Sequence, residues 1–153
     1  MRPRADHTAR ARSLSRKLAM QALYQWQLAG QSASELQQQF AAEEGYGDAE
    51  EDYFAGLIDG VTASVVALDT QLQPLIDRPL TQLDPVERAV LWIGVFELLH
   101  RPDVPYRVVI NEGVELAKRF GATDGHKFVN AVLDRAAREL RAAEQTAANP
   151  GGG

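Results

Sequence analysis

Apolar residues recur three and four positions apart along most of the chain, and almost nothing alternates as a β-strand does. The spacing predicts a first helix that Thr8 or Ser13 opens and that ends near Gly30. A short second helix is expected to run to about Glu44. The first third of the chain is therefore predicted to be helical.

The middle of the chain begins with a glycine-containing break at 45–47, after which Asp48 is placed to cap a third helix. The apolar pattern goes on through Leu68, either as a continuation of that helix or as a new one. Pro74 and Pro79 interrupt it.

A strong helix-start signal follows, made of Asp84 as the cap, Pro85 in the first turn and Glu87 three residues after the cap. The helix that it opens is apolar on most sides, at Val86, Ala89, Val90, Leu91, Ile93, Val95, Phe96, Leu98 and Leu99. We expect this central helix to be the most buried element.

Two amphipathic helices complete the pattern. Pro105 suits the first turn of one of them, and Gly121 ends it. The other starts just after Thr123 or Asp124 and runs to about Leu140. About seven helices result, and the predicted fold class is all-α.

These elements predict five segments within one compact protein. They are a flexible basic arm at 1–9, an N-terminal helical bundle at 10–76, a hinge at 77–83, a C-terminal helical bundle at 84–143 and a disordered tail at 144–153.

The net charge of -5 is unevenly distributed. Residues 1–20 contain six basic residues and one acidic residue, a net charge of +5, whereas the rest has 10 basic and 20 acidic residues, a net charge of -10. Such a layout suits a protein that binds a polyanion at one end and avoids it elsewhere. The alternative is that the N-terminal arginines are only solvated.

Composition and motifs argue against catalysis. The chain has no cysteine, its three histidines lack the spacing of a metal site, and no phosphate-binding glycine loop or nucleophile elbow occurs. We therefore predict a non-enzyme with no cofactor and no metal. No apolar run approaches the roughly 20 residues of a membrane span, so a cytoplasmic protein without membrane contact is expected.

The first candidate binding surface lies on the first helix and comprises Arg10, Arg12, Arg16, Lys17 and Tyr24. Arg12 and Arg16 are four residues apart and share a helical face, where guanidinium groups can grip phosphates or stack on bases. Tyr24 lies two turns further along that face, and its alternative role is a core or boundary ring.

The second candidate surface is the turn from Asp124 to Phe128. Lys127 is placed to pair with phosphate, and Phe128 to stack on a splayed base of single-stranded RNA. The alternative is that Phe128 packs in the core.

The third candidate surface is a partner-binding set of charged and aromatic residues at two helix starts: Glu87, Arg88, Tyr106 and Arg107. Helix capping and interaction with the helix dipole are the competing explanation for these residues.

Four stretches of sequence carry a family resemblance. They are A-M-Q-A-L-Y-Q-W-Q from Ala19, D-P-V-E-R-A-V-L-W-I-G-V-F-E-L from Asp84, V-P-Y-R-V-x-I-N-E-x-V-E-L-A-K-x-F-G from Val104 and H-K-F-V-N-x-V-L-D from His126. With them the chain resembles the NusB family of bacterial transcription antitermination factors from about Arg10 to Leu140.

The resemblance implies an all-helical fold of two three-helix bundles packed across one another. It also implies binding of boxA-type leader RNA together with NusE, a small-subunit ribosomal protein. The pair, with RNA polymerase and other Nus factors, would promote read-through of terminators, notably in ribosomal RNA operons. The resemblance also implies that RNA binds to two surfaces: the arginines and Tyr24 of the first helix, and the turn from Asp124 to Phe128. Glu87 would take part in complex formation, and a homodimer is compatible with the family.

The chain departs from the family pattern in two places. It reads Arg-Ser-Leu-Ser from Arg12 where a denser run of arginines is common, and it has Trp92 where a basic residue is common. The sequence leaves Trp92 open as either a core residue or an exposed partner contact. A different class of function therefore stays open, namely a purely protein-binding helical scaffold with an incidental basic arm. A methyltransferase of the kind that carries a NusB-like region would need a cofactor-binding α/β domain. We do not expect one, because the 13 residues after Leu140 leave no room for it.

Overall fold

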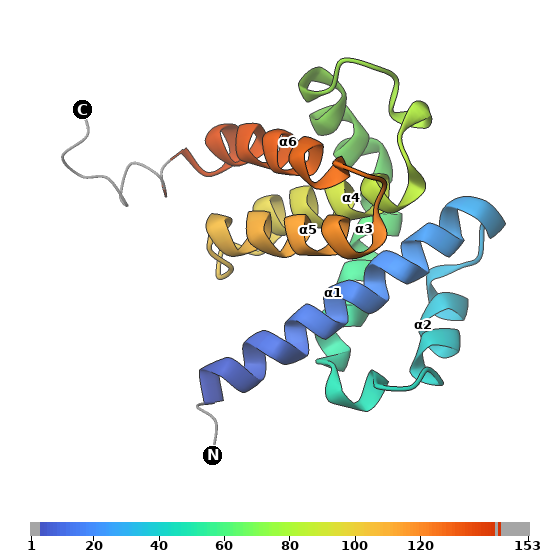
Figure 1. Cartoon of the computed structure of the whole chain (residues 1–153). Helices are drawn as coiled ribbons and strands as arrows, with labels where there is room; N and C mark the ends of the chain where they lie inside the picture. Colours follow the sequence, from blue (N-terminus) through green and yellow to red (C-terminus); the bar gives the residue numbers. More distant parts are fainter. Residues whose placement is uncertain (1–3, 143, 145–153) are drawn as a thin grey trace. The chain divides into compact units, whose positions relative to one another are not determined.

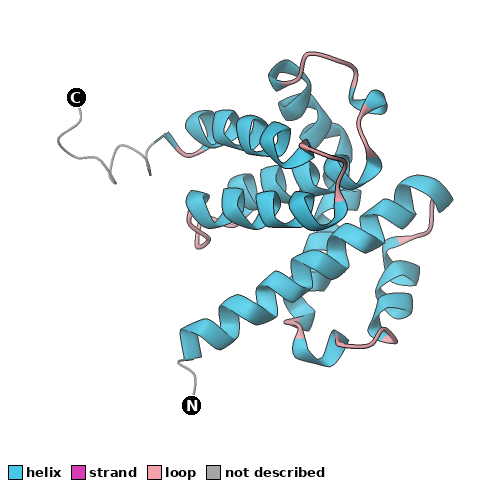
Figure 2. Cartoon of the chain, in the orientation of Figure 1, coloured by secondary structure: helices cyan, strands magenta, loops and turns pink. Residues whose placement is uncertain are grey.

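The structure is a computed structural model that describes residues 4–142 and 144. In those residues it contains six α-helices, three short 3-10 turns and no strand (Figures 1 and 2). The elements are α1 (Arg4–Ala29), α2 (Ala33–Ala41), η1 (Tyr46–Asp48), α3 (Glu51–Leu72), η2 (Gln73–Leu75), η3 (Leu80–Gln82), α4 (Pro85–His100), α5 (Tyr106–Phe120) and α6 (Gly125–Leu140). The all-α class is thus confirmed.

The helix count of about seven is not reached, because the pattern through Leu68 continues α3. That helix runs to Leu72, and Pro74 falls in the first turn of η2, where the amide hydrogen that it lacks is not needed. Asp48 ends η1 and does not cap α3, so that prediction was wrong.

The first helix begins at Arg4, earlier than the predicted starts at Thr8 and Ser13. It therefore covers part of the segment at 1–9 that is predicted to be a flexible arm. The tail predicted at 144–153 lies outside the described residues except for Glu144. The flexible arm, the hinge and the tail stay predictions.

The chain divides into two compact units, and the boundary between them along the chain falls within α3, between Val65 and Val66. The first unit has a core made by apolar residues of α1, α2 and the first half of α3. Phe54 lies at its centre, fully buried, with ring centroids 6.2 Å from Phe40 and 5.8 Å from Tyr46.

The second unit is built on mutual contacts of α4, α5 and α6. As predicted, α4 has the largest number of buried positions of these helices. Close packing depends on Gly94 of α4 and Gly113 of α5, since a Cβ atom at these positions would lie 2.6 Å and 2.8 Å from side-chain carbons of Leu133 in α6.

The buried Arg141 side chain closes the end of the second unit. Its guanidinium group donates to the backbone carbonyls of Leu98 at 2.8 Å and Val104 at 3.0 Å, and to two further carbonyls at the end of α4. The bond to Leu98 is of the kind that satisfies a carbonyl at the end of a helix, whereas the carbonyls of Glu97 and Arg101 also accept backbone N–H groups.

The stretch Glu51–Leu75, which is α3 with the turn after it, is long and apolar enough to cross a membrane by length and composition alone, with a mean hydropathy of 1.2. This corrects the expectation that no stretch approaches such a length. Phe54, Ile58, Leu68 and Leu72 of this stretch are fully buried. Its apolar composition is therefore also that of a core helix.

Candidate RNA and partner surfaces

The α1 surface is organised around Tyr53, the third residue of α3. Arg12 donates from Nε to Oε2 of Glu50 at 2.9 Å, and its guanidinium group lies 4.5 Å from the centroid of the Tyr53 ring. The Arg12 side chain is 24% exposed and the Glu50 side chain is 35% exposed. Arg12 thus reaches solvent while it is held by an acid and a ring.

Arg16 lies one turn further along α1 and is buried, with 2% exposure. Its Nη2 atom donates to the Tyr53 hydroxyl at 3.4 Å, and its guanidinium group lies 5.3 Å from the same ring centroid. The predicted common face of Arg12 and Arg16 is confirmed. A direct RNA contact by Arg16 stays a prediction, and its burial instead fits support of Tyr53.

The other members of the α1 surface are more open. Arg10 is exposed and Lys17 is half-buried. Tyr24 is 40% exposed, so it is not a core ring. Its position leaves part of the ring accessible for stacking.

The turn at the start of α6 contains Asp124, the one described non-glycine residue with a positive φ, at 62°. Its carboxylate does not cap α6 and instead lies 3.4 Å from the Lys127 ammonium group. The Lys127 side chain is 71% exposed. Phe128 is half-buried, and the Arg78 guanidinium group lies 4.8 Å from its ring centroid. The turn therefore offers a cation, while its aromatic ring already carries a stacked arginine.

Glu87 of α4 lies against this turn and accepts a hydrogen bond from the loop that leads into it. It is 7% exposed, and its Oε2 accepts the backbone N–H of Ala122 at 3.2 Å. A Cβ atom at Gly125 would lie 2.7 Å from the carboxylate. Burial raises the pKa of Glu87, with a smaller increase from Asp84, while the Ala122 bond and Arg78 act in the opposite direction. Glu87 thus ties the loop before α6 to α4, and partner binding by Glu87 stays a prediction.

Arg88 is tied to Asp69 and Trp92. Its Nη2 lies 3.3 Å from Asp69 Oδ2, while the Trp92 indole N–H donates to Asp69 Oδ1 at 2.7 Å. The Arg88 guanidinium group also lies 4.9 Å from the Trp92 ring centroid. Since Trp92 is 2% exposed, it is a core residue and not an exposed contact.

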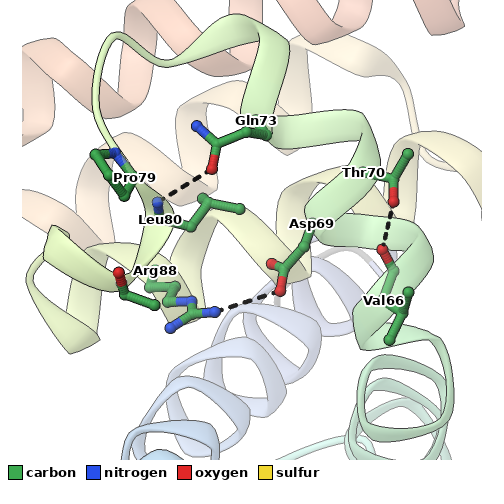
Figure 3. A pocket seen from close by; sticks show the side chains of 8 residues that line it. Val66, Asp69, Thr70, Gln73, Pro79, Leu80 and Arg88 are labelled. Atoms are coloured by element: carbon green, nitrogen blue, oxygen red, sulfur yellow. Dashed lines mark hydrogen bonds and ion pairs between the residues drawn. The ribbon is translucent and has the colours of Figure 1, made fainter.

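Arg88 also lines an open pocket of about 430 Å³ between the second half of α3 and the loop before α4 (Figure 3). A hydrogen bond of 3.2 Å from the Leu80 N–H to Gln73 Oε1 fixes that loop to α3. At its edge Val66 is 78% exposed. The lining residues are Val66, Asp69, Thr70, Gln73, Pro79, Leu80, Thr81 and Arg88.

Tyr106 and Arg107 start α5. The Tyr106 N–H donates to the Glu144 carboxylate at 3.1 Å, and Arg107 Nε donates to the Tyr106 hydroxyl at 3.2 Å. Arg107 is exposed. The first N–H of α5 is thus bonded to Glu144, and Arg107 presents an exposed cation. A partner contact by Tyr106 and Arg107 stays a prediction.

Sequence reasoning did not find Glu50, Tyr53 and Arg141, which organise the α1 surface and the end of α4. Glu50 and Tyr53 lie in an acidic stretch whose charge hides any pairing with α1, and Arg141 lies just after the last predicted helix. Residues of a metal-binding type do not gather in groups of three anywhere in the described residues.

Comparison with known proteins identifies the family. A model of the NusB family matches residues 13–138. The transcription antitermination protein NusB of Hahella chejuensis is 55% identical over 137 residues, which cover 90% of this chain and 92% of that protein. The protein of the same name from Alcanivorax borkumensis is 51% identical over 143 residues, with 94% and 95% covered.

Solved structures agree with this assignment. NusB of T. maritima matches with a TM-score of 0.73 and 29% identity, over 83% of this chain and 90% of that one. A chain from a crystal structure of the antitermination factors NusB and NusE in complex with dsRNA matches with a TM-score of 0.73 and 26% identity, over 85% and 98%.

These likenesses place the protein among transcription antitermination factors, which are regulatory proteins and not enzymes. Within that class, the chain belongs to the NusB family.

Proposed function

We propose that this protein binds boxA-type single-stranded leader RNA together with the ribosomal protein NusE and so promotes read-through by RNA polymerase, notably in ribosomal RNA operons. One observation carries the proposal: the match to a NusB chain that was crystallised with NusE and RNA covers 98% of that chain. Nearly all of the chain in that complex therefore has a structural counterpart in this protein.

The two RNA surfaces supply suitable chemistry. Arg10 and Arg12 on α1 and Lys127 on α6 are cations that reach solvent, as phosphate contacts require. Tyr24 offers a partly open ring on which a base can stack. The cations would therefore supply affinity for the RNA phosphates, and stacking on the ring would contribute to the choice of base sequence.

NusE is proposed to meet the second unit. Glu87, Arg88, Tyr106 and Arg107 are the residues we assign to partner contact. Of these, Arg107 is the most open, and the pocket beside Arg88 provides an apolar surface for a partner side chain. Assembly with other Nus factors on RNA polymerase is part of the same proposal, as is a cytoplasmic location, where bacterial transcription takes place.

Two finer features belong to the proposal. The helices are inferred to group as two three-helix bundles, α1–α3 and α4–α6, with the hinge at 77–83. A homodimer is compatible with this arrangement, and light scattering over a concentration series tests it.

The decisive experiment compares labelled RNAs of equal length by fluorescence anisotropy at one near-physiological salt concentration. The RNAs are a boxA-type single strand, a scrambled strand and a boxA duplex, each with and without NusE. The proposal expects a preference for the boxA strand that grows when NusE is present. The duplex is included because the RNA of the matched complex is double-stranded.

Equal and weak binding to all three RNAs would overturn the RNA proposal and favour the protein-binding scaffold. That alternative draws on the burial of Arg16 and the pairing of Arg12 with Glu50, both of which are structural contacts. A scaffold would bind NusE equally well with and without RNA, both in the wild type and after Arg12 and Lys127 are replaced by glutamine.

A further inference from the structure

Glu50 is fixed opposite α1 by its own backbone. Its N–H donates to Ser15 Oγ at 3.0 Å and to the Ala11 carbonyl at 3.3 Å, and Ser15 Oγ donates to the Glu50 carbonyl at 2.8 Å. Ser15 is fully buried. The Glu50 carboxylate can therefore leave Arg12 by rotation of its side chain, whereas its backbone stays on α1.

The ion pair between Glu50 and Arg12 matters more for the local charge of the α1 surface than for the free energy of unfolding. Both side chains are partly exposed, and part-exposed ion pairs contribute little to the free energy of unfolding. A phosphate that approaches Arg12, however, meets a carboxylate bonded to the same guanidinium group at 2.9 Å. The attraction of one charge is largely cancelled by the repulsion of the other.

We propose that Glu50 is a built-in competitor of RNA phosphate at Arg12, which keeps Arg12 from holding RNA by charge alone. The inference rests on the proposed RNA-binding function and adds a residue that acts against it. RNA must then gain affinity from base stacking or from a partner protein, and a strand that offers only phosphates binds poorly. Repulsion built against unwanted ligands is a general route to specificity.

The site allows charge to be separated from geometry. In Glu50→Gln the side-chain oxygen still accepts from Arg12 Nε, and the Tyr53 ring still lies against the guanidinium group. Glu43→Gln is the matched control, because Glu43 is exposed and makes no side-chain contact with an arginine in the described residues. Both variants remove one negative charge from the same unit.

The experiment measures anisotropy of boxA-type and scrambled single-stranded RNA against the whole chain, with and without NusE, over a salt series. Glu50→Gln is expected to bind both RNAs about three- to tenfold more tightly than the wild type. Its plot of log affinity against log salt should steepen by about 0.7, the contribution of one phosphate contact on a single strand. Glu43→Gln should stay within about twofold of the wild type.

A double-mutant cycle ties the effect to Arg12. In an Arg12→Gln background, Glu50→Gln should behave as Glu43→Gln does, since no guanidinium group is left to release. Equal affinities of the Glu50→Gln and Glu43→Gln proteins would overturn the competitor role. Weaker binding by Glu50→Gln would overturn it as well, and would make Glu50 a residue that positions Arg12.

The cycle also separates this inference from the function on which it rests. If the wild type binds boxA RNA and Glu50→Gln gains nothing, the competitor role alone fails. If no variant binds either RNA even with NusE present, the proposed function fails and the competitor role fails with it.

Discussion

The α1 surface and the turn at the start of α6 are both predicted to bind RNA, but they are built in opposite ways. On α1, Arg16 is 2% exposed and Arg12 shares its charge with Glu50, while both arginines lie against Tyr53. In the turn, Lys127 is 71% exposed. A basic residue in a binding motif can therefore contact RNA directly or hold a neighbouring side chain in place, and its burial distinguishes the two roles.

The largest expected effect tests Arg16 as a support. Arg16→Ala should lower the free energy of unfolding by about 3 kcal/mol, because it removes the contacts of Arg16 with Tyr53 together with the packing of its buried stem. Lys127→Ala should change it by less than about 0.5 kcal/mol. Urea unfolding followed by circular dichroism measures both. Equal, small losses would show that Arg16 is a surface residue in solution.

Each of the two surfaces also contains one aromatic ring that is predicted to stack on an RNA base. Tyr24→Ala and Phe128→Ala should each weaken boxA binding by about five- to a hundredfold, the range for losing one stacked base. Tyr24→Phe retains the ring and serves as control. Anisotropy titrations with NusE present measure the change. Unchanged affinity in either alanine variant removes that ring from the RNA surface.

Lys127 should act by charge alone. Lys127→Gln is expected to weaken binding of boxA-type and scrambled RNA by a similar factor and to reduce the salt slope by about 0.7. A salt series of titrations provides the slope. A loss confined to boxA RNA would contradict this and would make Lys127 a base-reading residue.

The smallest effect concerns Glu87, which supports the turn. Burial raises the pKa of Glu87 above its ordinary value near 4.5, so the folded state favours the protonated form. This stabilisation is fully present below pH 4.5 and is lost as pH rises through the raised pKa. The stability of the wild type relative to Glu87→Gln should therefore fall as pH increases above 4.5.

Urea unfolding at a series of pH values from 4 to 7 tests this dependence on the Glu87 carboxyl group. The exposed Glu115 provides a control, since Glu115→Gln should leave the pH profile of the wild type unchanged in shape. A constant difference between the wild type and Glu87→Gln across the range would contradict the role of burial.

Much of the fold could be predicted from the sequence, because helix starts and stops are local. The cap at Asp84 forms two hydrogen bonds with the first turn of α4, as the pattern predicts. The start of α1 was misplaced, because the helix begins at Arg4, ahead of both predicted starts, Thr8 and Ser13. The predicted cap at Asp48 failed because Glu50, pinned to Ser15, takes the place before α3.

The sites were harder to predict than the helices. Spacing places Arg12 and Arg16 on one face, but contact with Tyr53 joins residues about 40 positions apart and leaves no trace in local pattern. Trp92 could have been core or surface, and only its bond to Asp69 and its burial show that it is core. Long-range pairing of this kind depends on the folded chain.

The two glycines that face Leu133 have a consequence for how this protein can change over generations. Gly94 and Gly113 leave space that one leucine side chain fills, so the three positions share a fixed volume. A methyl group gained at either glycine requires the Leu133 side chain to shift or a smaller residue at 133. Substitutions at these three positions are therefore expected to be coupled in their effect on stability, and not to add independently.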